Sequence, residues 1–98
     1  MSTVLLVSDL PEYTLKIETY HGWSVFVHCE VHQWSFKTRR MLIEDLDSLQ
    51  KGNLIELWAA LKPEETQRIR FAKLFGFEES NYLRSPANGE LYQILERR

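Results

Sequence analysis

The stretch that decides the fold of this chain is Arg68-Ile69-Arg70-Phe71-Ala72-Lys73-Leu74-Phe75-Gly76-Phe77-Glu78. Its apolar and charged residues recur at helical spacing, which predicts an amphipathic helix. Gly76 follows the last apolar position as a typical C-terminal cap, and the next residue is a large aromatic. Because proline is tolerated in a first helical turn, we expect this helix to run from Pro63 to Phe75.

Strands are predicted on both sides of this helix. The segment Leu54–Leu61 is almost wholly apolar, as expected of an interior strand that is covered on both faces. Two further strands, Glu79–Leu83 and Glu90–Leu95, flank the turn sequence Ser85-Pro86-Ala87-Asn88-Gly89 and predict a hairpin.

The first half of the chain predicts three strands and one helix. Thr3–Val7 and Tyr13–Glu18 are the first two strands, and the second alternates apolar and polar residues. A turn at His21-Gly22 leads into a long strand, Trp23–Trp34, which carries Cys29 on one face and His28, Glu30 and His32 on the other.

A helix is predicted over Phe36–Lys51, with Ile43, Leu46 and Leu49 on one stripe and Leu42 beside it. Gly52-Asn53 is expected to end this helix as a left-handed cap. The predicted order is therefore β-β-β-α-β-α-β-β. We expect an α+β fold in which a mixed, mostly antiparallel sheet of five to six strands is flanked by two helices.

Composition limits the classes of function. The chain has 98 residues, 44% hydrophobic and 27% charged, which is typical of one small globular domain. Its formal net charge of −2 gives no general attraction to nucleic acid or to an anionic membrane. The single cysteine, Cys29, excludes an internal disulfide and favours a reducing compartment. No signal peptide or membrane span is predicted, so we expect an intracellular protein or one packed in a particle made inside a cell.

An ordered set of motifs in the second part of the chain resembles a known family. The set is Val31-His32-Gln33-Trp34, Lys37-Thr38-Arg39-Arg40, Leu57-Trp58, the stretch Arg68–Phe77, Glu79, Tyr82, Arg84 and Leu91-Tyr92-Gln93-Ile94. From Trp23 onward, the order of elements resembles the closing part of the GCN5-related N-acetyltransferase (GNAT) fold. Within that superfamily the chain is most similar to small bacteriophage proteins, including internal virion proteins of short-tailed phages. The resemblance implies a single truncated GNAT-like domain over residues 1–98 that lacks the N-terminal helices of the full fold.

The chain departs from the motifs that the resemblance would require of an active enzyme. Working members bind the pyrophosphate of acetyl-CoA with a glycine-rich turn, but the matching segment, Phe36–Met41, contains no glycine. Ala72 stands where the family often has a tyrosine general acid, and Thr66 lies about where it has an asparagine. The resemblance therefore implies a scaffold without catalysis and without a cofactor.

Lys37, Thr38, Arg39 and Arg40 are the candidate cofactor-binding residues if acetyl-CoA does bind. Cations at a helix N-terminus oppose the helix dipole, so a phosphate or an acidic partner would explain them. They could instead be solvated residues whose stems cover Trp34 or Phe36. In the enzyme alternative, Glu30 or His32 would be the catalytic base, because the family often draws its base from this strand.

The sequence offers further candidate surfaces for binding. Trp34, which we expect to be exposed, forms a candidate partner-binding site together with Arg39 and Arg40. No metal site is predicted, because alternating strand positions stand ~6.5–7 Å apart and three of them rarely converge on one ion. An acidic patch of Glu44, Asp45 and Asp47 would suit a nucleic-acid mimic or an inhibitor.

These observations favour a small phage-type protein that uses a non-catalytic GNAT-like scaffold for protein–protein interaction. It would be a virion component, or a modulator or inhibitor of a host protein in the cytoplasm of an infected bacterium. The alternative is an acyl-CoA-dependent N-acetyltransferase with an atypical pyrophosphate site. Because the truncated fold leaves one sheet face bare, we expect a homodimer or an obligate complex with a partner.

Overall fold

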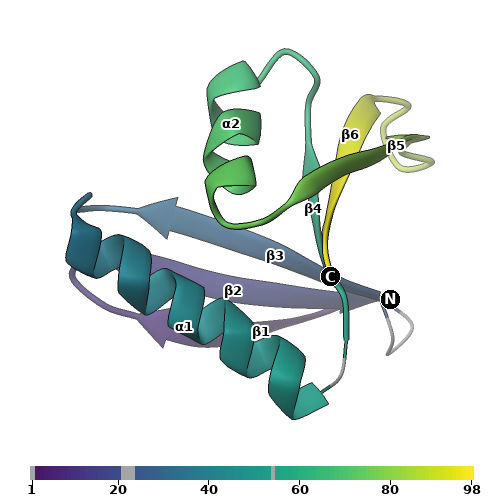
Figure 1. Cartoon of the computed structure of the whole chain (residues 1–98). Helices are drawn as coiled ribbons and strands as arrows, with labels where there is room; N and C mark the ends of the chain where they lie inside the picture. The colour runs from purple at the N-terminus through teal and green to yellow at the C-terminus, as the bar shows by residue number, and fades with distance from the viewer. Residues whose placement is uncertain (1, 21–23, 54) are drawn as a thin grey trace. The chain divides into compact units, whose positions relative to one another are not determined.

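The computed structural model describes residues 2–20, 24–53 and 55–98. The elements follow the predicted order and are β1 (Ser2–Asp9), β2 (Tyr13–Tyr20), β3 (Ser24–Val31), α1 (Phe36–Asn53), β4 (Leu57–Leu61), α2 (Thr66–Leu74), β5 (Glu78–Arg84) and β6 (Leu91–Arg97). The six strands form one open, mostly antiparallel sheet in the order β1-β2-β3-β4-β6-β5. The predicted α+β fold with two helices is confirmed (Figure 1).

The chain divides into two compact units, Met1–Leu57 (unit 1) and Trp58–Arg98 (unit 2), and each is described by itself. Among the described residues, neither helix combines the length and the hydropathy that crossing a membrane would require. The single truncated GNAT-like domain over residues 1–98 stays a prediction.

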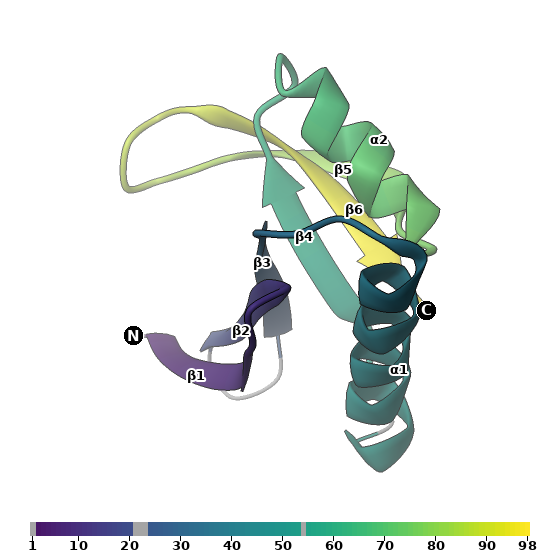
Figure 2. The same ribbon diagram turned by 90° about the vertical axis from the view of Figure 1, so that its left-hand side faces the viewer.

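Unit 1 is an antiparallel meander of β1, β2 and β3 with α1 across one face (Figures 1 and 2). Tyr13 and Leu15 of β2 point to the same side of the strand and are almost completely buried. Leu42 and Leu46 of α1, four residues apart and therefore on one helix face, are buried as well. The remaining residues of the predicted stripe, Ile43 and Leu49, are half-buried.

Several predicted boundaries in unit 1 are corrected. β3 ends at Val31 and does not continue to Trp34, because the backbone N–H groups of His32 and Gln33 both donate to the carbonyl of Glu12, at 2.8 and 3.0 Å. The left-handed cap predicted at Gly52-Asn53 is wrong, since Gly52 lies inside α1 and its φ is not positive. The turn predicted at His21-Gly22, and Trp23 after it, lie outside the described residues.

Unit 2 contains α2 and the antiparallel hairpin of β5 and β6. α2 begins at Thr66, three residues later than predicted, after a turn in which the backbone N–H of Lys62 donates to Glu65 Oε2 at 2.9 Å. β4 begins at Leu57, later than predicted, because Ile55 and Glu56 are not in a strand; Leu54, where the predicted strand starts, lies outside the described residues. Ala60 is exposed, so the prediction of a strand covered on both faces is wrong.

The end of α2 confirms the prediction for Gly76, whose φ is +89°. The N–H of Gly76 donates to the carbonyl of Lys73 at 3.1 Å, and that of Phe77 donates to Ala72 at 3.3 Å. Arg97 of β6 donates through Nε to the carbonyl of Phe75 at 2.6 Å, which satisfies another acceptor at the helix end. Phe75 and Phe77 are buried, so this segment fills the core of unit 2.

Candidate functional site

The start of α1 is held by a local hydrogen-bond cluster. Ser35 precedes the helix, and its Oγ accepts from the backbone N–H of Thr38 at 3.1 Å, as an N-cap serine does. Thr38 is completely buried, and its hydroxyl donates to the carbonyl of Gln33 at 2.7 Å. This candidate cofactor ligand therefore lies inside unit 1, where it fixes the turn that leads into the helix.

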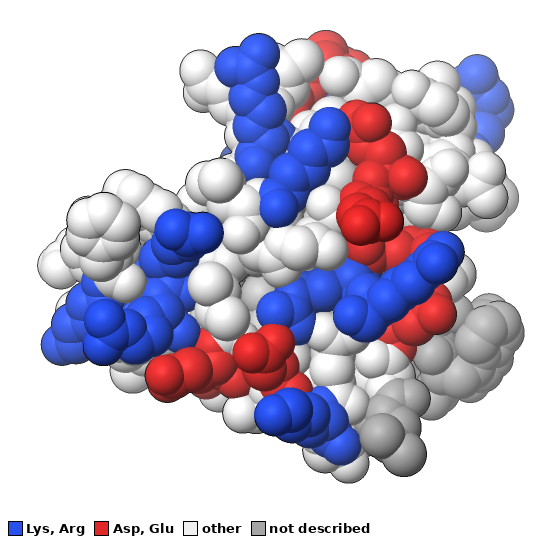
Figure 3. Space-filling model, in the orientation of Figure 1, with Lys and Arg blue, Asp and Glu red and all other residues white. Residues whose placement is uncertain are grey.

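The side chains around this turn project outward. Trp34 is 53% exposed, which confirms the prediction for this residue, and Phe36 is 85% exposed. Lys37, Arg39 and Arg40 are exposed beside them. Figure 3 shows blue side chains gathered with uncharged atoms over the beginning of α1. We call these five residues the basic–aromatic surface.

The charges of this surface are not neutralised by neighbours. Within the part of the chain that the structure describes, Lys37, Arg39 and Arg40 form no ion pair or side-chain hydrogen bond. The first turn of α1 also contains no acidic residue. Three positive charges therefore stand near the positive end of the helix dipole, an arrangement that becomes favourable only when an anionic group approaches.

The two candidate bases lie on one face of the β2–β3 pair. His32 has its Nε2 3.0 Å from the hydroxyl of Thr14, which donates to Asp9 at 3.2 Å. Glu30 is directly opposite Thr14 in the strand register and is exposed. The hydroxyl of Thr14 therefore lies between the His32 ring and the carboxylate of Asp9, and these contacts orient His32.

The same face carries His28, whose Nε2 lies 3.0 Å from Glu18 Oε1. Each histidine is therefore engaged by a different residue of β2. Among the described residues, no three metal-ligating side chains converge on one point.

The predicted acidic patch is divided by the structure. Asp45 accepts hydrogen bonds from the hydroxyls of Tyr13 and, at 2.7 Å, Ser8, so it connects α1 to both β1 and β2. Burial, together with the hydrogen bond and the charge of Asp45, raises the pKa of Tyr13 above its ordinary value. Asp45 thus acts inside unit 1, while Glu44 and Asp47 are exposed.

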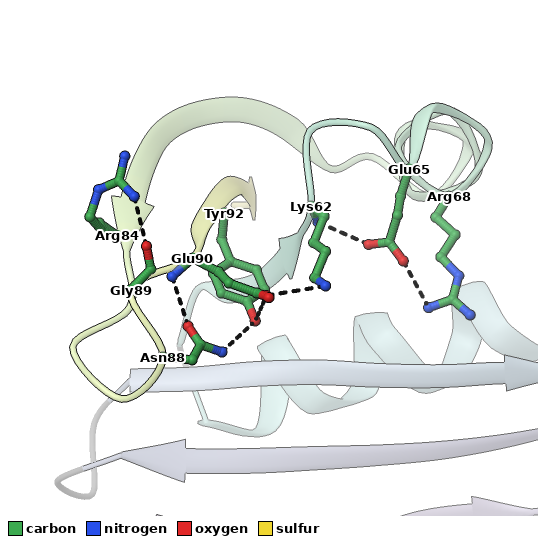
Figure 4. Close-up of polar contacts among 8 residues, drawn as sticks. All are labelled: Lys62, Glu65, Arg68, Arg84, Asn88, Gly89, Glu90 and Tyr92. Atoms are coloured by element: carbon green, nitrogen blue, oxygen red, sulfur yellow. Dashed lines mark hydrogen bonds and ion pairs between the residues drawn. The ribbon is translucent and has the colours of Figure 1, made fainter.

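A second polar cluster lies in unit 2, around the start of β6 (Figure 4). Lys62 Nζ is 3.1 Å from Glu90 Oε2, which also accepts from the hydroxyl of Tyr92 at 3.3 Å. Asn88 donates to that hydroxyl at 3.3 Å. The hydrogen bond and the charge of Glu90 raise the pKa of Lys62 above its ordinary value. The cluster ties the β5–β6 turn to the end of β4.

Comparisons with models of protein families, with curated proteins and with solved structures find no match to this chain.

Phe36 is the member of the surface that the sequence analysis did not select. The buried positions of α1 begin with Thr38 and continue four and eight residues later at Leu42 and Leu46. A residue two positions before Thr38 lies on the opposite side of the helix, since each residue turns the helix by about 100°. The helical period could thus have marked Phe36 as outward-facing, provided that the buried stripe had been placed correctly.

Proposed function

We propose that this chain is a non-catalytic interaction module with a GNAT-like scaffold, and that it binds a protein partner through the basic–aromatic surface. The resemblance to small phage proteins supports a role as a virion component or as a modulator of a host protein. The observation that carries the proposal is an 85% exposed Phe36 beside an exposed Trp34 and three cations that form no ion pair with any described residue.

The composition of this surface defines the partner. Aromatic residues and arginines are enriched among the residues that dominate the binding energy of interfaces. Phe36 and Trp34 would enter an apolar pocket, while Arg39, Arg40 and Lys37 would pair with carboxylates around it. The partner should therefore be a protein surface with an apolar depression and an acidic rim.

Local features weaken the alternative of acetyl-CoA binding. The first turn of α1 lacks glycine, the hydroxyl of Thr38 is committed to Gln33, and Ala72 offers no proton. The cations alone could still attract a pyrophosphate, so this alternative needs its own measurement.

The test is capture of partners from host and infected-cell lysates by the immobilised chain and by two variants. Phe36→Ala with Arg39→Glu should reduce capture of the specific partner at least tenfold, because it removes an aromatic anchor and reverses a charge. The matched control is Leu74→Ala with Arg70→Glu, which changes an exposed apolar residue and an exposed arginine of α2. Equal loss in both variants, or no loss in the first, would contradict the proposal.

Calorimetric titration with acetyl-CoA separates the enzyme alternative. The proposal expects no heat of binding at millimolar ligand. Binding that disappears in Arg39→Ala and Arg40→Ala would overturn the non-catalytic reading and favour a pyrophosphate clamp.

A further inference from the structure

The first strand of the sheet presents an unusual edge. β1 stands at the end of the strand order, so on one side of its backbone the described part of the chain places no neighbouring strand. Val4, Leu5 and Leu6 are 56%, 52% and 58% exposed. Successive residues of a strand point to opposite faces, so apolar side chains are exposed on both faces of this edge.

Edge strands usually carry features that prevent pairing with another chain, such as charges, proline or a bulge. From Ser2 to Ser8, β1 contains no charged residue and no proline. Its register with β2 is regular from Ser2 to Leu6 and shifts only between Leu6 and Ser8. Five consecutive residues therefore form a regular, neutral edge.

The opposite edge of the sheet is β5, and it carries the charges that Ser2–Ser8 of β1 lacks. β5 has Glu78 and Glu79 at its start and Arg84 at its end. Its register with β6 shifts near its start, between Glu79 and Asn81, which leaves four regularly paired residues, Asn81–Arg84. The contrast with β1 is informative because both strands are exposed, with Leu83 of β5 52% exposed.

We propose that two copies of this chain associate through β1, which pairs with β1 of the second copy in antiparallel orientation. A two-fold axis at Val4 uses all five regular residues and places Val4 opposite Val4 of the second copy. Thr3 then lies opposite Leu5 of that copy, and Ser2 lies opposite Leu6. The sheets of the two copies continue into each other, and the free N–H and C=O groups of both edges are paired.

The absence of charge along Ser2–Ser8 favours β1 of a second copy as the strand that pairs with this edge. A charged side chain opposite Val4 or Leu5 would lose solvation without gaining a partner, so the pairing strand should be neutral. β5 does not meet this condition, which disfavours head-to-tail growth of β1 onto β5 of the next molecule. Two-fold pairing of β1 with β1 of a second copy does meet this condition of neutrality. It also stops at the dimer, because the pairing occupies the β1 edge of both copies and leaves none for a third.

The dimer should be weak, because a few strand residues on each side bury far less than the ~1,600 Å² of a standard interface. We therefore expect a dissociation constant of tens to hundreds of micromolar. This inference is independent of the proposed function, since no residue of the basic–aromatic surface takes part.

Sedimentation equilibrium at roughly 10 to 500 µM chain tests the association. The wild-type chain should shift from monomer to dimer over this range, while Val4→Lys and Leu5→Lys should raise the dissociation constant at least tenfold. Leu83→Lys is the matched control, because it places the same charge on the exposed apolar residue of β5. Circular dichroism of each variant checks that the fold is intact.

Cysteine trapping tests the register. In a Cys29→Ser background, Val4→Cys should form a disulfide-linked dimer under mild oxidation, because its side chain meets its own copy at the two-fold axis. Leu83→Cys should not form one at the same rate.

Three results would overturn the proposal. They are a chain that stays monomeric at 500 µM, a dimer that Leu83→Lys weakens as much as Leu5→Lys, and a monomer whose β1 instead captures a different protein in a manner that Val4→Lys abolishes.

Discussion

Unit 1 and unit 2 each hold one helix against their strands, but by different means. In unit 1, α1 is connected to β1 and β2 through the carboxylate of Asp45, which accepts from Ser8 and from the buried Tyr13. In unit 2, α2 is held at its C-terminus, where Gly76 turns the chain and Arg97 donates to the carbonyl of Phe75. The comparison teaches that side-chain substitutions should be most damaging in unit 1 and backbone substitutions in unit 2.

Asp45→Ala should have the largest effect. It leaves the buried hydroxyl of Tyr13 without an acceptor, and we expect the free energy of unfolding to fall by about 3 kcal/mol. Urea denaturation followed by tryptophan fluorescence measures this change. Glu44→Ala, which removes an exposed carboxylate of the same helix, should change stability by no more than ~0.5 kcal/mol. Similar losses in both variants would show that Asp45 is not the connection between α1 and the sheet.

Two glycines, Gly52 inside α1 and Gly76 after the end of α2, should respond in opposite directions. Gly76→Ala should destabilise the protein by about 1–2 kcal/mol, because alanine is strained at a positive φ. An added Cβ would meet Arg97 only at an ordinary 3.6 Å, so the cost is in the backbone. Gly52→Ala should stabilise α1 by about 0.5 kcal/mol, because Gly52 has helical neighbours and no atom within 4 Å of the added Cβ. Thermal unfolding of the two variants shows whether the signs differ as expected.

Tyr13 gives unit 1 a dependence on alkaline pH. Its pKa is raised in the folded protein, whereas an unfolded tyrosine ionises near a pH of about 10. Its contribution to stability is therefore complete below about pH 10 and is lost as the pH rises above that value. Tyr13→Phe should cost about 1–2 kcal/mol at neutral pH and should flatten the decline above pH 10. Unfolding curves between pH 8 and 11 compare the two proteins, and parallel declines would contradict the assignment.

The polar cluster of unit 2 should matter least. Lys62 and Glu90 are both exposed, and water screens such a pair. We expect Lys62→Ala to leave the melting temperature unchanged within experimental error. A loss comparable to that of Asp45→Ala would remove the distinction between the two units.

The sequence predicted the order of the elements because helical and strand periodicity are local properties. It could not distinguish Gly52, which lies inside α1, from Gly76, which lies beyond the end of α2, since each comes shortly after the last apolar residue of a helical pattern. The positive φ of Gly76 accompanies the burial of Phe77 and the hydrogen bond from Arg97 to Phe75, two residues that lie 22 positions apart in the chain. Asp45 was placed in a surface patch for the same reason, because its partners Ser8 and Tyr13 lie on distant strands.

The candidate site was predicted in part. Trp34, Arg39 and Arg40 are exposed as a partner site requires, and their clustering follows from closeness in sequence. The inward orientation of Thr38 depends on its hydrogen bond to the carbonyl of Gln33 and on which face of α1 packs against the sheet. The residue type of Thr38 alone reveals neither.

The hydrogen bond from Thr38 to Gln33 should also affect the rate at which a partner binds the basic–aromatic surface. Trp34 lies between the carbonyl of Gln33 and the backbone N–H of Thr38, and both of these groups are already hydrogen-bonded in the free protein. A partner that contacts Trp34 and Phe36 would not have to order this segment first, so the conformational entropy of the turn is lost on folding and not on binding. Association at this surface should therefore proceed at the rate of oriented diffusional encounter, and low salt should accelerate it through the three cations.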